Sequence, residues 1–300
     1  MNSKKGIGIL CAVLGGISWG FSACFGQYLF ENVPVDTNWV ISLRLVFAGL
    51  IFVVISIATQ GKKTFAIFKN FQDMRRLLVF GILGMFGSQY TFYLAIQHAN
   101  AGTATVLQSL ATVMILIYVS ITHRKMPKIK QTVAILLALF GVVLLSTGGD
   151  FTTLQMSQIA LVAGLLSAVG AACYNMLSGG IIRKYGVYSV AGFGMLISGL
   201  IFLPFARPWE TAVTLSPQLF IGMFGVVVIG TAVAFGFFLK GVSIVGPLMG
   251  SLIGTLEPVS AVVISALLLG SNFTTVDFIA FAMILWSVFW LCLQERSFRN

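Results

Sequence analysis

Long apolar runs alternate with short polar breaks along the whole chain. We identify ten such runs, at residues 7–29, 38–58, 77–96, 102–121, 131–147, 157–178, 188–205, 217–238, 246–268 and 275–293. Each is close to the roughly 20 residues that an α-helix needs to cross the hydrocarbon core of a bilayer. The two-residue alternation of membrane β-strands is absent, and helices satisfy their own backbone groups in lipid. The pattern therefore predicts an all-α integral membrane protein with ten transmembrane helices.

The breaks between these runs differ in charge. If the N-terminus is cytoplasmic, all of the 18 Lys and Arg residues except Arg44 and Arg207 lie in cytoplasmic segments. Basic residues concentrate in the cytoplasmic loops of membrane proteins. The first run is too long for a signal-peptide core of about 7–15 residues, so we expect an uncleaved first helix. The charge pattern predicts a multi-pass protein of the cell (cytoplasmic) membrane with both termini in the cytoplasm.

Composition narrows the class further. Hydrophobic residues make up 58% of the chain and charged residues 9%, and the mean hydropathy is +1.00. A soluble protein is about 45–50% apolar and about 25% charged. The net charge of +10 comes from the loops and predicts no nucleic-acid partner. The cysteines lie inside apolar runs and indicate packed free thiols; we expect no metal site and no cofactor. They are Cys11, Cys24, Cys173 and Cys292.

Catalytic sequence motifs are missing as well. The chain has no metalloprotease helix motif, no nucleophile elbow and no phosphate-binding lysine loop. We therefore expect no catalytic residues and no enzymatic activity. Because there is no nucleotide-binding segment, uphill movement of a solute would draw on an ion or solute gradient.

The second half of the sequence repeats the first. Residues 95–112 can be laid without a gap on residues 241–258, which places Leu110 on Leu256. The first and sixth runs also align, which places Ser22 on Tyr174. Because each unit has five helices, an odd number, the second unit enters the membrane from the side opposite to the first. The inverted repeats of secondary transporters have this arrangement. We predict two inverted five-helix repeats, residues 1–148 and 149–300, around a central cavity.

These features resemble those of the EamA-type carriers in the drug/metabolite transporter superfamily. The second repeat carries Leu256-Glu257-Pro258-Val259, and the first helix carries Trp19-Gly20. The resemblance implies a ten-helix inverted repeat that moves amino acids or other small metabolites, often outward. The first repeat has Thr112 where such proteins usually have a proline. We therefore expect its fourth helix to be straighter than the ninth.

Polar residues within the helices predict the lining of the cavity. Gln108 and Thr112 share one face of the fourth helix, and Thr255 lies on the matching face of the ninth. Small polar residues also promote close helix packing, which is the alternative for the Ser and Thr positions. The predicted substrate-binding residues are Trp19, Ser22, Gln89, Tyr93, Gln108, Thr112, Tyr174, Asn175, Phe235 and Thr255. An apolar, aromatic pocket with a few amides and hydroxyls suits an amphipathic solute.

Two charged residues lie inside the runs. A carboxylate at mid-membrane costs roughly 2.5–3.5 kcal/mol, so Glu257 is a candidate proton or charge site. The alternative is a structural hydrogen bond near the helix break at Pro258. Arg44 is a candidate entrance residue for a substrate carboxylate, although reaching to the surface or pairing with Glu31 or Asp36 is favoured by its position.

These expectations combine into one functional prediction. We expect a secondary transporter that exports amino acids or related small metabolites by alternating access, with protons as a candidate partner. The helices expected to line the path are 1, 3, 4, 6, 8 and 9. The alternatives are a multidrug or organic-cation exporter, a passive channel or facilitator, and a non-transporting membrane enzyme or assembly subunit. The sequence is compatible with a monomer and with a dimer.

Overall fold

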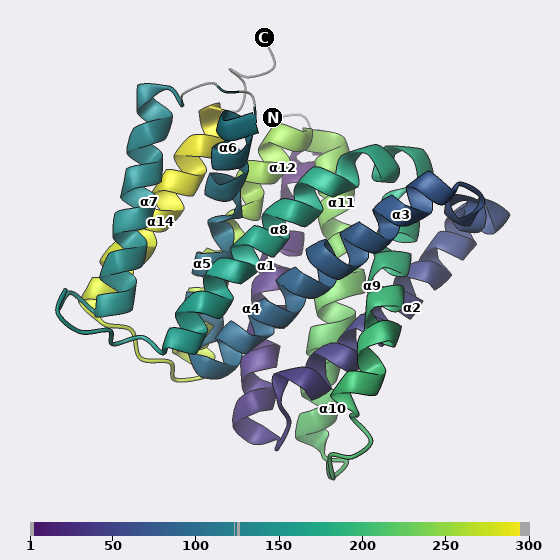
Figure 1. Cartoon of the computed structure of the whole chain (residues 1–300), viewed down its shortest axis with the longest axis horizontal. Helices are drawn as coiled ribbons and strands as arrows, with labels where there is room; N and C mark the ends of the chain where they lie inside the picture. Colours follow the sequence, from purple (N-terminus) through teal and green to yellow (C-terminus); the bar gives the residue numbers. More distant parts are fainter. Residues whose placement is uncertain (1–2, 123, 125–126, 295–300) are drawn as a thin grey trace.

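The chain folds as a bundle of membrane-length helices. The computed structural model describes residues 3–122, 124 and 127–294, and within these residues there are helices and no strands (Figure 1). Nine described helical segments are long and apolar enough to span a membrane, and a shorter apolar helix covers Leu252–Leu268. The predicted all-helical membrane fold is therefore confirmed.

The first half supplies five of these segments. They are α1 (Ser3–Asn32); α2 (Thr37–Gln60), followed by the 3₁₀ helix η1 (Gly61–Lys69); α3 (Phe71–Val79), η2 (Phe80–Phe86) and α4 (Gly87–His98) in one span; α5 (Ala101–Ser109) with α6 (Ala111–Thr122); and α7 (Ile129–Thr147). Side-chain caps start α2, α3 and α5, since Asp36 accepts a hydrogen bond from the Trp39 amide, Asn70 from the Asp73 amide and Asn100 from the Thr103 amide.

The second half has the same order of elements. They are α8 (Gln158–Tyr185); α9 (Val187–Ala206); α10 (Pro217–Phe224), η3 (Gly225–Val233) and α11 (Ala234–Val245) in one span; α12 (Pro247–Gly254) with α13 (Leu256–Leu268); and α14 (Thr275–Gln294). Several helices exceed the predicted runs: the third span begins at Phe71 and α8 continues to Tyr185. These extensions carry charged residues, which lower the hydropathy of the segment although its backbone is helical. The predicted runs, which depend on hydropathy, are therefore too short.

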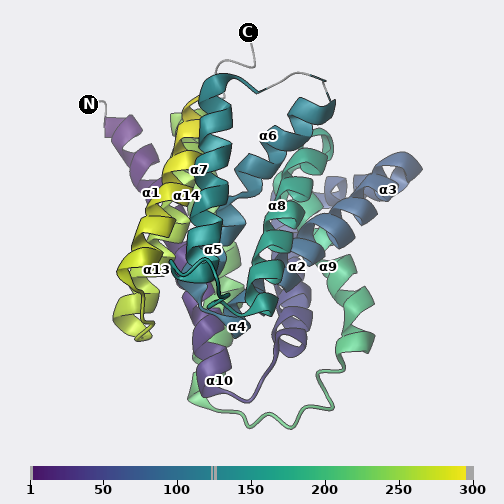
Figure 2. The same ribbon diagram turned by 60° about the vertical axis from the view of Figure 1, so that its left-hand side comes forward.

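Each half packs against the other through equivalent helices. α1 packs on η3 and α11, and α8 packs in the same way on η2 and α4. α2 pairs with α9, α5 with α13 and α7 with α14. In Figure 1 both termini lie at one end of the molecule; α1 runs away from that end, whereas α8 runs toward it. Figure 2 shows the same arrangement after rotation. Hereafter this is the termini end, and the opposite one is the far end.

Both fourth helices of the repeats are interrupted at matching positions. The first breaks at Leu110 between α5 and α6, and the second at Thr255 between α12 and α13. Just before or at each break a hydroxyl turns back to the backbone: Ser109 donates to the Val106 carbonyl at 2.6 Å and Thr255 to the Leu252 carbonyl at 2.7 Å. Such bonds compete with the helical ladder. The expectation of a straighter fourth helix is therefore wrong, because the break does not require a proline.

The third and eighth spans each contain a π-helical segment, η2 and η3. A neighbouring helix of the other half crosses each segment at a glycine. A Cβ atom added at Gly84 would lie 2.7 Å from the Cβ of Tyr174, and one added at Gly230 would lie 2.7 Å from the Cβ of Ser22. Ser22 and Tyr174 occupy equivalent repeat positions. π-Helical turns are frequent at functional sites, and here they lie beside the central cavity.

Candidate functional site

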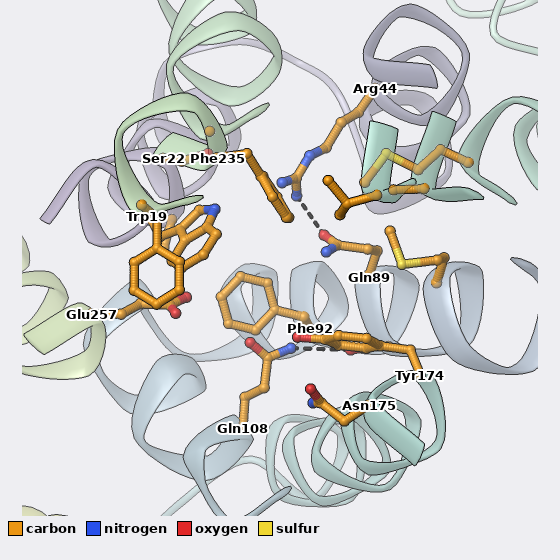
Figure 3. Close-up of a pocket in the computed structure, with 18 of the residues that line it drawn as sticks. Trp19, Ser22, Arg44, Gln89, Phe92, Gln108, Tyr174, Asn175, Phe235 and Glu257 are labelled. Atoms are coloured by element: carbon orange, nitrogen blue, oxygen red, sulfur yellow. Dashed lines mark hydrogen bonds between the residues drawn. The ribbon is translucent and has the colours of Figure 1, made fainter. Parts of the chain in front are cut away.

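A cavity of about 300 Å³ lies between the two halves of the chain (Figure 3). Such a volume is at the small end of the range for ligand pockets, roughly 300–1,000 Å³. Most of the residues predicted from the sequence line it: Trp19, Ser22, Gln89, Tyr93, Gln108, Tyr174, Asn175 and Phe235, together with Arg44 and Glu257. All six helices expected to line the path contribute, and α2 and α9 contribute as well.

Two predicted residues are not brought to this cavity. Neither Thr112 nor Thr255 is among the described residues that line it. The Thr255 hydroxyl is bonded to the Leu252 carbonyl at the helix break. Thr112 follows the equivalent break at Leu110, in the first turn of α6. The prediction assumed an uninterrupted helix at both positions, whereas the structure has breaks at Leu110 and Thr255.

Other lining residues were missed by the sequence analysis. They include Ala23, Phe80, Met85, Ser88, Phe92, Ile182, Val187, Ala191, Met195, Gly230, Phe238 and Leu239. Val187, Ala191 and Met195 recur every four residues on α9, which marks a common face. In a membrane helix an apolar face of this kind is equally typical of lipid contact. No signal in this sequence separated the two environments.

Aromatic rings form one wall of the cavity. The Trp19 ring lies 4.9 Å from that of Phe235 and 4.7 Å from that of Phe238, measured between centroids. Phe235 also makes an edge-to-face contact with Phe52 at 5.2 Å. These contacts join α1 and α2 of the first half to α11 of the second half. The wall offers flat apolar surfaces and ring faces that attract cations.

Amide side chains provide polar contacts on the remaining surface. Gln108 donates to the Ser88 hydroxyl at 3.3 Å, and Asn175 donates to the Ala171 carbonyl at 2.7 Å. The Gln89 carbonyl accepts a hydrogen bond from Arg44. Figure 3 shows Gln89, Gln108 and Asn175 around the aromatic groups. The cavity thus combines a largely apolar interior with a few oriented polar groups.

Arg44 points into the cavity and not toward the surface. Arg44 is only 7% exposed, and its Nη1 atom lies 2.7 Å from Oε1 of Gln89. Its guanidinium also lies over the ring of Tyr93, 4.8 Å from the centroid. No carboxylate among the described residues lies within 4.0 Å of it, so pairing with Glu31 or Asp36 is not observed. The two arrangements favoured by its sequence position are therefore both wrong.

Glu257 reaches the cavity from α13, next to the break at Thr255. Its carboxylate has no hydrogen bond or ion pair with any residue in the described part of the chain. Ser260 donates instead to the backbone carbonyl of Glu257, at 2.9 Å. Figure 3 shows Glu257 and Arg44 on different sides of the cavity. The structural hydrogen bond considered for this carboxyl group near Pro258 is not observed.

Polar clusters connect the two halves at either end of the molecule. Toward the termini end, the buried carboxylate of Asp73 accepts hydrogen bonds from Lys184 at 2.5 Å and from Tyr185 at 2.7 Å. Toward the far end, Gln27 donates to Ser271 at 2.9 Å and accepts from Ser265 at 2.8 Å. Each cluster joins residues that are far apart in the sequence, and any relative motion of the halves must alter one of them.

Known proteins resemble this chain over nearly its whole length. The profile of the EamA-like transporter family matches twice, over residues 6–147 and 158–293. A protein of Salmonella typhimurium described as the uncharacterized inner membrane transporter YicL is 38% identical over 289 residues, which cover 96% of each chain. The uncharacterized transporter YetK of Bacillus subtilis is 24% identical, over 93% of this chain and 84% of its own.

A solved crystal structure shares the overall fold. It superposes with a TM-score of 0.62 at 18% sequence identity and covers 98% of this chain and 99% of its own. The similarity extends from the first helix to the last, in agreement with the two matches to the family profile.

Proposed function

Because this chain belongs to the EamA-like transporter family and is a transporter of the membrane, we propose that it exports amino acids or related small metabolites by alternating access. The observation that carries this proposal is the cavity at the interface of the two halves. It is lined by residues of α1, α2, η2, α4 and α5 on one side and of α8, α9, η3, α11 and α13 on the other. A solute held between two movable units can be exposed to each side of the membrane in turn.

The proposed moving units are residues 1–148 and 149–300. The close crossings at Gly84 and Gly230 and the π-helical segments η2 and η3 support this division, because each crossing joins one unit to the other at equivalent positions. In the proposed cycle, opening toward the termini end separates Asp73 from Lys184 and Tyr185. Opening toward the far end separates Gln27 from Ser265 and Ser271.

The proposed cargo is amphipathic. The wall of Trp19, Phe235 and Phe238 would hold an apolar body and could contact an ammonium group through the ring faces. Among the described residues that line the cavity there are one guanidinium and one carboxylate, which fits a zwitterion better than a multiply charged phosphate ester. Glu257 is the proposed proton site, since a carboxylate without a protein partner in a membrane cavity can bind and release a proton.

Counterflow in proteoliposomes tests the proposed cargo class. Purified protein is reconstituted with an unlabelled amino acid inside, and uptake of the labelled compound is compared with that of a panel of lipophilic organic cations. We expect saturable exchange of amino acids and little exchange of cations. Exchange of the cations alone would support the rival exporter function, in which Glu257 serves as the counter-charge. Exchange of neither class would contradict the proposal.

Cysteine labelling tests the proposed orientation, with both termini and the termini end in the cytoplasm. Lys63 is exposed in η1 of the first half, and Lys240 is exposed in α11 of the second half. Arg207 is exposed directly after α9, which ends at the far end (Figure 1). Single cysteines at these positions are introduced into a variant without native cysteines and labelled in intact cells with an impermeant maleimide. We expect labelling at position 207 and none at positions 63 and 240 until the membrane is opened. Labelling of 63 and 240 from opposite sides would contradict the inverted repeat.

A further inference from the structure

A buried arginine with unused hydrogen-bonding capacity lies on one side of the cavity. One N–H group of Arg44 donates to Gln89, and the other N–H groups have no acceptor among the described residues. Arg44 is 7% exposed, so water can reach these N–H groups only from the cavity. Buried guanidinium groups are normally paired with an anion, because an unpaired buried charge is costly.

A second unsatisfied group lies beside it. Tyr93 is fully buried, and its hydroxyl has no hydrogen-bond partner in the described part of the chain. Ser22 and Arg44 approach this hydroxyl without completing a hydrogen bond to it. Buried polar groups nearly always have a partner in native proteins, and an exception calls for an explanation. All three residues line the cavity.

The surrounding structure holds these groups in place. The guanidinium lies against the Tyr93 ring, and Gln89, one helical turn before Tyr93 on α4, accepts its hydrogen bond. The Tyr93 ring is enclosed by Phe30 and Phe92, and α1 has Gly26 where any Cβ atom would lie 2.6 Å from the ring. The guanidinium is therefore held in place before any ligand is bound, which reduces the entropy lost on binding.

We propose that Arg44 and Tyr93 form the subsite that binds the carboxylate of the transported solute. This inference rests on the proposed function and specifies how the cargo is selected. A guanidinium matches the two oxygens of a carboxylate, and a phenolic O–H adds a third donor. Arg44 is the only cation among the described residues that line the cavity, which indicates a single negative charge on the bound group. The aromatic wall lies elsewhere in the cavity and is free to hold the apolar part.

The subsite explains selection against related compounds. A cargo without the carboxylate, such as the carboxamide of the same amino acid, leaves the guanidinium unpaired in a buried place. Sites built to pair with a polar group reject analogues that lack it. We therefore expect the protein to distinguish each amino acid from its carboxamide, although the two have nearly the same size and the same ammonium group.

The first experiment is competition in counterflow by reconstituted full-length protein. Amino acids with apolar side chains, phenylalanine and leucine among them, are compared with their carboxamides and with the corresponding decarboxylated amines. We expect the acids to exchange at least about tenfold better than either analogue, as loss of a charged hydrogen-bond partner implies. Equal exchange of the carboxamides would overturn the subsite while leaving the transport function in place. If no compound exchanges, the transport function itself is contradicted, and the subsite with it.

Variants then assign the selection to the two residues. Arg44→Gln is expected to raise the KM for acids by about tenfold or more and to remove the preference over carboxamides, whereas Arg44→Lys restores part of it. The matched control is Arg207→Gln, which removes an exposed arginine that pairs with Glu210 outside the cavity. An unchanged acid preference in folded Arg44→Gln protein would overturn the proposal.

Tyr93→Phe separates binding from a structural role. It removes only the hydroxyl that lacks a partner, so the melting temperature without ligand should stay the same or rise. The KM for acids should still increase by about tenfold, and the thermal shift produced by a bound amino acid should shrink. A fall in melting temperature with an unchanged KM would show that the hydroxyl is structural and would overturn its assignment to the subsite.

Discussion

Replacing Glu257 by glutamine is expected to abolish gradient-driven transport. The carboxylate faces the cavity and has no hydrogen bond or ion pair within the described part of the chain. Glutamine keeps the shape of the side chain but cannot take up or release a proton. Proteoliposomes with an imposed pH gradient should therefore lose uphill movement down to the level of protein-free vesicles. Counterflow of the same solute, which needs no proton movement, should retain most of its rate.

The matched control for this experiment is Glu210→Gln. Glu210 is an exposed carboxylate outside the cavity that pairs with Arg207, and its replacement should leave both assays unchanged. Uphill transport that persists in Glu257→Gln would rule out the proposed proton site. Loss of both activities in folded protein would assign Glu257 to cargo binding instead. Flux that never saturates and ignores the substitution would favour the passive facilitator.

A methyl group added at Gly15 is expected to lower the stability of the protein strongly. Gly15 lies where α1 crosses α11, and a Cβ atom there would lie 2.6 Å from the backbone nitrogen of Phe238 and 2.7 Å from its Cα. The obstacle is backbone and cannot rotate away. Helices in membranes pack closely through such small residues. Gly15→Ala should cost about 1–3 kcal/mol, measured as a lower melting temperature in detergent.

Gly236 supplies the comparison within the same pair of helices. It lies on α11, and a Cβ atom added there would have no atom within 4 Å apart from its own helix and chain neighbours. Gly236→Ala should therefore leave the melting temperature unchanged or raise it slightly, since alanine favours the helix. Equal stability of the two variants would contradict the contact between α1 and α11.

Hydropathy and charge were sufficient to predict the membrane fold and the approximate positions of its helices. Each of the ten apolar runs overlaps a helical span of the structure. The errors occur at the ends, as at Phe71 and Tyr185, because charged residues lower the hydropathy of a segment without ending its helix. The break at Leu110 was also missed, because the sequence analysis expected a break only where a proline is present.

The cavity was predictable only in part, and the reason is physical. Polar residues are costly in lipid, so Gln89, Gln108, Asn175 and Glu257 could be assigned to an interior surface from the sequence alone. An apolar residue such as Met195 is equally stable against lipid and against a cavity, so its position depends on how the helices pack. Packing also determined that Arg44 lies beside Tyr93 in the cavity, a contact between separate helices that neither helix encodes by itself.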